Sequence, residues 1–240
     1  MSVNDNEQYG AVDDVQYGAD DNAQNSAADS VRYSVIDNGI IDALSAVIES
    51  RSAEGGEHSA RIKGYTRILL EQVNDVYETQ LSSEEKEIAY AASVLHDVGK
   101  IAIPDSVLLK PGRFTRDEFE VMKQHTVLGC KIIESIRGFQ DRRFLECCHT
   151  ICRYHHERYD GKGYPDGLAG EDIPLIAQIV SMADVYEALV SKRSYRQSFS
   201  ADQAYEMIVN GECGAFSPNL LVCLARAKAQ MEAFARQPLD

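Results

Sequence analysis

The sequence contains no tryptophan, no pair of cysteines in CxxC spacing and no apolar run long enough to cross a bilayer. A membrane-spanning helix needs about 20 consecutive apolar residues, so we expect no contact with a membrane. Six cysteines without CxxC spacing favour reduced thiols over disulfides or zinc ligands. The first residues also lack the basic and apolar regions of a secretory signal. Together these absences predict a soluble cytoplasmic protein.

Basic residues are scarce, with 24 Lys and Arg against 38 Asp and Glu and a net charge of −14. Binding to polymeric nucleic acid needs clustered Lys and Arg, so we expect no such partner. Residues 1–30 contain seven acids and no Lys or Arg, which leaves the rest of the chain at −7. A small phosphorylated ligand is not excluded, because bound metal cations would reverse the local field.

The composition divides the chain into two parts. Residues 1–33 are rich in Asn, Asp, Gln, Ser and Ala and show no hydrophobic periodicity, which predicts a disordered acidic tail. Residues 34–240 carry the apolar pattern of one folded domain. The role of the tail and the signal that controls the domain stay open.

No segment shows the alternating pattern of a strand, so we expect an all-α bundle of roughly seven to nine helices. Three capping boxes mark helix starts, at Ser82 with Glu85, Thr115 with Glu118, and Ser200 with Gln203. Other helices are expected from about Asp37, from His58, before His155, and after Pro174 and Pro218. We expect the helix from Ser82 to run into His96 and to end at Gly99, and separate helices up to His125 and from Leu128 to Ile136.

Histidines and acids gather in a few short segments at the ends of these expected helices. A single histidine is more often structural than a ligand, as we expect for His149, and Asp184 alone could be a hydrogen-bonded buried acid. Because so many occur together, we predict a metal site. Imidazole and carboxylate ligands suit Mn, Fe or Zn, and the number of ligands suits two or three ions. The predicted metal ligands are Glu54, His58, His96, Asp97, His125, His155, His156 and Asp184.

Substrate contacts are predicted at three places. Lys100, four residues after His96, is either a phosphate donor or an exposed lysine at a helix end. Arg193 and Arg196 are three residues apart, and their guanidinium groups suit a phosphate, although from the pair alone a plain surface pair is favoured. The glycine-rich loop of residues 160–167 is predicted to form the substrate rim, shaped by Tyr164 and Pro165.

These residues give the chain its resemblance to the HD-GYP domain, a bacterial subgroup of the HD metal-dependent phosphohydrolases. The similarity covers about residues 37–235, and no ligand position is lost. One small departure from the family pattern is Phe216-Ser217-Pro218, remote in sequence from the ligands. The matching segments are Glu57-His58-Ser59 with Arg61, His96-Asp97-Val98-Gly99-Lys100, Lys110-Pro111-Gly112, Met122-Lys123-x-His125, His155-His156-Glu157 through Gly163-Tyr164-Pro165, Ala183-Asp184 through Leu189, and Arg193-x-Tyr195-Arg196.

The resemblance implies an HD-type helical bundle in which a glycine-rich loop lies beside a multinuclear metal site. It further implies two or three divalent ions, iron or manganese, and hydrolysis of cyclic di-GMP to linear pGpG, GMP or both. Asp97 and Lys100 would then be catalytic, and Glu54 would serve a third ion. Two alternatives stay open: hydrolysis of another cyclic dinucleotide such as cyclic GMP-AMP, and a non-catalytic module that binds cyclic di-GMP or another protein. A homodimer and a signalling partner protein also stay open.

Overall fold

The computed structural model describes residues 39, 41, 43–51, 57–137, 141–191 and 198–238. These residues belong to one compact unit that runs from Asn38 to Asp240. The predicted tail at residues 1–33 lies outside the described residues, as do Glu54, Arg193 and Arg196. Within the described ranges the chain forms helices and loops and no strand, which confirms the all-α prediction.

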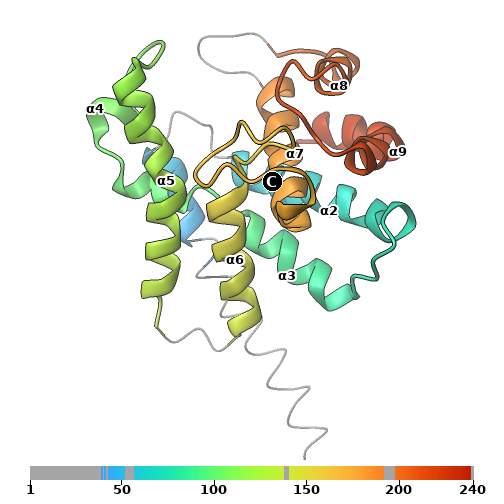
Figure 1. Cartoon of the computed structure of the whole chain (residues 1–240), viewed down its shortest axis with the longest axis horizontal. Helices are drawn as coiled ribbons and strands as arrows, with labels where there is room; N and C mark the ends of the chain where they lie inside the picture. The colour runs from blue at the N-terminus through green and yellow to red at the C-terminus, as the bar shows by residue number, and fades with distance from the viewer. Residues whose placement is uncertain are drawn as a thin grey trace, which may run out of the picture. The chain divides into compact units, whose positions relative to one another are not determined.

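The helices pack side by side, with α2 against α9 and α7, and α5 against α6 (Figure 1). Residues 43–51 are helical and precede α2. The elements that follow are α2 (His58–Val76), α3 (Ser83–Ser93), η1 (Val98–Ala102), α4 (Asp105–Leu108), α5 (Arg116–Ser135), α6 (Arg142–Tyr154), η2 (Gly170–Asp172), α7 (Leu175–Val190), α8 (Ala201–Val209) and α9 (Pro218–Ala235).

The predicted capping boxes are confirmed at the starts of α3, α5 and α8. In each, the side chain of the N-cap residue accepts from the backbone N–H three residues on. The side chain at that third position in turn accepts from the backbone of the N-cap residue. Because these contacts are local, the residues concerned determine where the helix begins.

Two predicted helix boundaries are wrong. Residues 116–135 form the single helix α5, because His125, Gly129 and Ile133 continue one buried face through the expected break. The helix α3 ends at Ser93 and does not reach His96. Residues 94–97 instead form turns with backbone bonds between residues three apart, and the 3₁₀ helix η1 follows.

Two groups of buried apolar side chains hold the helices together. One joins α2, α7, α8 and α9 around Tyr65, Met182 and Leu224. The other joins α3, α5 and α6 around Ile133 and Ile151. The helix α7 contributes residues to both groups. A row of buried histidines and acids also lies in this interior, and such groups are costly to bury without partners.

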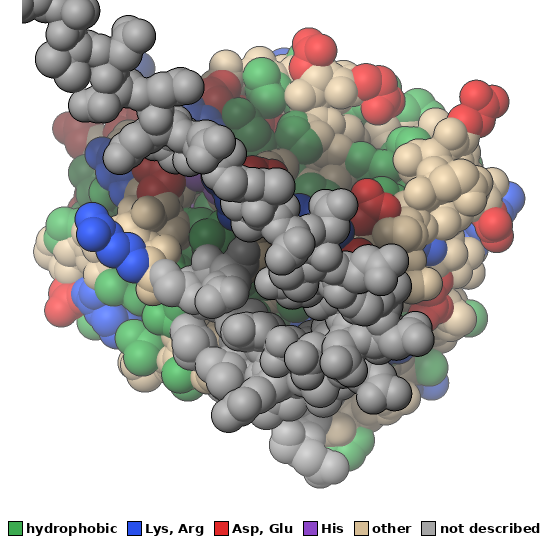
Figure 2. Space-filling view, turned by 90° about the horizontal axis from the view of Figure 1, so that it is seen from below, with side chains coloured by type: hydrophobic (Ala, Val, Ile, Leu, Met, Phe, Trp, Pro, Cys, Tyr) green, Lys and Arg blue, Asp and Glu red, His purple; other side chains and the backbone are tan. Residues whose placement is uncertain are grey.

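The surface carries charges of both signs. On the face in Figure 2, acidic and basic side chains are interspersed with apolar ones. Among the described residues, no helix combines the length and the apolar character needed to cross a membrane.

Candidate metal centre

Seven of the eight predicted metal ligands come together in two groups, each with ligand atoms within 4.8 Å of one another. Glu54 is the eighth and lies outside the described residues. The first cluster is Asp97, His125, His155 and His156, and the second cluster is His58, His96 and Asp184. The adjacent residues His96 and Asp97 therefore belong to different clusters and join them.

Most of these side chains stand at the ends of helices that converge in the interior. His58 is the first residue of α2, and His155 is the C-cap of α6. Asp97 is the N-cap of η1, directly after His96 in the turn. The other ligands reach the centre from helix interiors on α5 and α7 and from the residue after His155. Helix ends free these side chains from the regular 100° spacing, so neighbours in sequence can converge.

Backbone carbonyls fix the orientation of three imidazole rings. The Nδ1 atoms of His96, His125 and His155 lie 2.9, 2.7 and 2.9 Å from a carbonyl oxygen three or four residues earlier. A carbonyl oxygen only accepts, so Nδ1 carries a proton in all three rings, and the neutral rings of His125 and His155 present the Nε2 lone pair to the interior. Metal-ligating histidines are held in this manner.

The inward-facing nitrogen and oxygen atoms of the clusters lie as close together as ligand atoms around a bound cation do. Nε2 of His125 lies 3.4 Å from Nε2 of His155, although both carry lone pairs. Oδ1 of Asp97 lies 3.3 Å from Nε2 of His125 and 3.8 Å from Nε2 of His155. Among the described residues this oxygen is buried without a hydrogen-bond partner, and Nε2 of His96 lies 3.1 Å from Oδ2 of the same carboxylate. Buried acceptors without donors are costly, so the two clusters fit a multinuclear metal site.

The protonation states also suit metal binding. Burial, with the neighbouring imidazoles, lowers the pKa of His155 to about 3 and that of His156 well below its ordinary value. Burial alone would raise the pKa of Asp97, but Lys100 and His96 hold it well below its usual range. For His96, burial disfavours the charged form, yet Asp97 outweighs it and raises the pKa to about 9. The ligands are therefore mostly in the form that metals bind, and a metal at His96 displaces a proton.

A buried glutamate on α7 supports the second cluster and was not predicted from the sequence. Oε2 of Glu187 lies 3.1 Å from Nδ1 of His58, and both side chains are 6% exposed. Glu187 follows Asp184 by three residues, so both lie on the same face of α7. A carboxylate behind a histidine ligand fixes the ring and raises its basicity. The sequence signal was present, because Glu187 stands one turn after a predicted ligand, but its partner on α2 could not be foreseen.

Replacing Glu187 with Ala should weaken metal binding at the second cluster by about 10-fold to 100-fold, because His58 loses its anchor. The measurement is metal content per protein across a series of free manganese concentrations. Glu206→Ala, an exposed glutamate on α8, is the matched control. Equal metal content in Glu187→Ala and the parent at every concentration would contradict a role for Glu187.

The glycine-rich loop between α6 and α7 lies beside α5 and over the end of α6 (Figure 1). The buried side chain of Glu157 anchors the loop. Its Oε1 accepts hydrogen bonds from the backbone N–H groups of Asp166 at 2.7 Å and Gly167 at 3.0 Å. The N–H of Tyr164 donates to the carbonyl oxygen of His156 at 3.2 Å. The ring of Tyr164 lies 4.8 Å from the ring of His156, centre to centre. The loop is thus folded back onto the first cluster.

Pro165 follows Tyr164 through a cis peptide bond, and both side chains are partly exposed. Lys100 reaches the first cluster from η1, with Nζ 2.7 Å from Oδ2 of Asp97 and 15% of its side chain exposed. Lys100 is therefore mostly buried, unlike the exposed lysine at a helix end that the alternative describes. Arg193 and Arg196 stay predictions, because they lie outside the described residues.

For any reaction catalysed at this centre, replacing Glu157 with Ala should lower kcat/KM by about 10-fold to 100-fold, because small displacements of substrate-positioning groups are costly. Metal content should stay at the parent level, since Glu157 touches the loop and belongs to neither cluster. Glu157→Gln keeps an acceptor oxygen in place and should stay close to the parent. Steady-state kinetics and metal analysis check both expectations, and parent-like kinetics in Glu157→Ala would show that the anchor is not needed.

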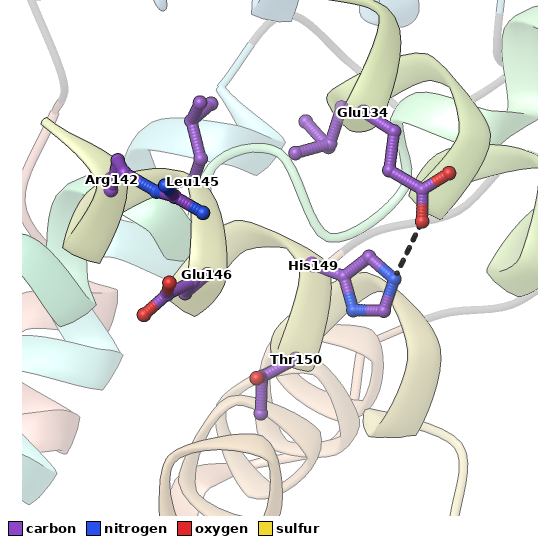
Figure 3. A pocket seen from close by; sticks show the side chains of 7 residues that line it. Glu134, Arg142, Leu145, Glu146, His149 and Thr150 are labelled. Carbon is purple, nitrogen blue, oxygen red and sulfur yellow. Dashed lines mark hydrogen bonds and ion pairs between the residues drawn. The ribbon is translucent and has the colours of Figure 1, made fainter. Parts of the chain in front are cut away.

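His149 lies apart from both clusters, as expected for a structural histidine. Its Nε2 lies 3.1 Å from Oε1 of Glu134 across α5 and α6 (Figure 3). The pair borders a surface pocket of about 320 Å³, which is lined by none of the clustered residues. Its lining residues are Ile133, Glu134, Arg142, Leu145, Glu146, His149 and Thr150.

Comparison with known proteins identifies the family. The family described as "HD domain" matches residues 42–219. The chain belongs to the HD domain family. A solved structure, described as Bd1817, an HDG"Y"P protein from Bdellovibrio bacteriovorus, superposes with a TM-score of 0.56 at 17% identity. The match covers 81% of this HD-domain chain and 57% of that one, and it shows the fold alone.

Relatives with named activities are more similar in sequence. A Vibrio cholerae protein named "Cyclic di-GMP phosphodiesterase" is 41% identical over 198 residues, or 81% of this chain. The Xanthomonas campestris "Cyclic di-GMP phosphodiesterase response regulator RpfG" is 42% identical over 192 residues, or 80% of this chain. The HD-domain chain spans 40% and 48% of the lengths of these two relatives. These matches confirm the predicted resemblance to HD-GYP proteins.

Proposed function

We propose that this protein is a metal-dependent phosphodiesterase that hydrolyses cyclic di-GMP to linear pGpG, GMP or both. The observation that carries the proposal is the crowding of inward-facing imidazole lone pairs around Asp97, beside a loop folded onto the same cluster. The names of the two relatives support the choice of substrate.

The proposed metal ligands are Glu54, His58, His96, Asp97, His125, His155, His156 and Asp184. Two or three divalent ions held there, iron or manganese, would lower the pKa of water and neutralise phosphate charge. Asp97 belongs to the first cluster, contacts His96 of the second cluster and keeps its negative charge next to Lys100. The ammonium of Lys100 has three donors and can reach a phosphate oxygen beside Asp97.

Specificity is proposed to come from the rim of the site. The ring of Tyr164 borders the first cluster, and Pro165 follows it through a cis peptide bond. We place a purine attached to the scissile phosphate against this part of the loop. Arg193 and Arg196 are proposed to bind the second phosphate or a guanine edge, since guanidinium groups suit both. We place the activity in residues 34–240 and in the cytoplasm, with a small dinucleotide rather than a nucleic acid as substrate.

A second candidate substrate is 3'3'-cyclic GMP-AMP. A Vibrio cholerae protein named "3'3'-cGAMP-specific phosphodiesterase 2" is 37% identical over 181 residues, which cover 75% of this chain and 33% of that protein. The metal ligands cannot separate the two rings, because both present the same phosphodiester. The purine contacts decide, and competition between the two substrates measures their effect.

The test is to load the protein anaerobically with iron or manganese and to follow each cyclic dinucleotide, alone and mixed, by chromatography. Cleavage of cyclic di-GMP, lost in His155→Ala and kept in His149→Ala, is the expected result. The two variants remove the same side chain, one inside the first cluster and one in the separate pair with Glu134. Metal-loaded protein that leaves both rings intact would refute the proposed function.

A further inference from the structure

The N-terminal half of α5 carries an exposed phenylalanine next to the loop that borders the first cluster. Phe119 is 44% exposed and lies six residues before His125 on the same helix. Single exposed apolar side chains are common and need no explanation by themselves. Phe119 differs because its ring touches the rim of the candidate centre.

A row of rings leads from the first cluster to Phe119. The ring of Tyr164 is tilted by 31° against that of His156, with 4.8 Å between the ring centres. The ring of Phe119 meets Tyr164 edge to face, at 83° and 6.0 Å. Phe119 and Tyr164 therefore form the two walls of an aromatic corner that opens to solvent beside the metal ligands.

The ammonium group of Lys123 lies in this corner. Nζ of Lys123 is 5.5 Å from the ring centre of Phe119 and 5.8 Å from that of Tyr164. The same atom lies 2.7 Å from Oε2 of Glu120, and an ammonium group has two more donors. Lys123 belongs to the Met122-Lys123-x-His125 segment, but the proposed reaction gives it no role.

We propose that Phe119 and Lys123, with Tyr164, form a guanine-binding shelf at the mouth of the metal centre. The base stacks on the exposed ring of Phe119, as nucleobases do on aromatic side chains in single-strand binding proteins. Guanine then turns O6 and N7, two acceptors, toward the ammonium of Lys123. Adenine offers an N–H donor in place of O6, so Lys123 favours guanine. This inference rests on the proposed function and names the residues that choose the base.

Equilibrium binding tests the shelf without relying on turnover. Titration calorimetry of manganese-loaded protein compares GMP, AMP and ribose 5-phosphate, which carries the phosphate without a base. In Phe119→Ala we expect the Kd of GMP to rise about 5-fold to 100-fold and that of ribose 5-phosphate to stay unchanged. Phe119→Trp should restore GMP binding. In Lys123→Met the preference for GMP over AMP should fall.

Two matched controls remove a phenylalanine and a lysine at positions outside the shelf. Phe114→Ala removes another exposed phenylalanine, and Lys131→Met removes an exposed lysine farther along α5. Unchanged GMP binding in Phe119→Ala, or parent protein that binds GMP no tighter than ribose 5-phosphate, would overturn the shelf. The proposed function is judged separately by cleavage of cyclic di-GMP in the parent protein, so a parent that cleaves the ring while Phe119→Ala binds GMP normally would refute the shelf alone.

Discussion

Asp97→Asn is expected to remove metal from both clusters and to lower turnover of cyclic di-GMP by about 1,000-fold or more. The reason is that Asp97 belongs to the first cluster and also contacts His96 of the second cluster. Its Oδ1 lies 3.3 Å from Nε2 of His125 and 3.8 Å from Nε2 of His155. Its Oδ2 lies 3.1 Å from Nε2 of His96 and 2.7 Å from Nζ of Lys100. An amide of the same shape carries no charge and places an NH₂ donor where a cation would bind.

The measurements are metal content of anaerobically purified protein and cyclic di-GMP turnover, with circular dichroism to show that the variant is folded. Asp202→Asn is the matched control, because Asp202 is an exposed residue on α8 whose partner is Lys228. Folded Asp97→Asn protein with the metal content and turnover of the parent would show that the two clusters do not depend on Asp97.

Local chemistry made part of the fold predictable. Each capping box joins groups only three residues apart, so the starts of α3, α5 and α8 follow from short stretches of sequence. The errors arose where packing overrides local signals. The expected helix up to His96 ends earlier at Ser93, since η1 lies tightly against α5. The expected break after His125 is absent, since the buried face of α5 continues to Ile133.

The candidate site was also predictable only in part. That the histidines and acids come together could be predicted, because they gather in a few short segments of the sequence. The place of His125 could not, since it was expected at a helix end and lies inside α5. The division of the ligands into two clusters could not be predicted either, since it depends on how α2, α5, α6 and α7 meet. The contact between Glu187 and His58 joins residues 129 positions apart, and no local pattern predicts it. The same holds for Phe119 and Tyr164, which lie on different segments.

The packing of η1 against α5 gives the other large expected effect, in Gly99→Ala. A Cβ atom at position 99 would lie 1.8 Å from the carbonyl oxygen of His125 and 2.5 Å from the backbone nitrogen of Gly129. Both are backbone atoms inside a helix, so neither can rotate away as a side chain would. The free energy of unfolding should fall by about 3 kcal/mol or more, at the upper end of the cost of overpacking. For a domain of this size the Tm should fall by about 6 °C or more.

Gly129→Ala is the matched comparison on the same interface. Its Cβ would meet the Cβ of Cys152 at 3.3 Å, a tight contact with a side chain rather than a clash with backbone. Urea and thermal unfolding should therefore rank Gly99→Ala well below Gly129→Ala in stability. Any Gly99→Ala protein that folds should also bind metal more weakly, because Asp97 is the N-cap of η1 and would move away from His125 with it. Equal stability of the two variants would mean that η1 and α5 are not held at the distance seen here.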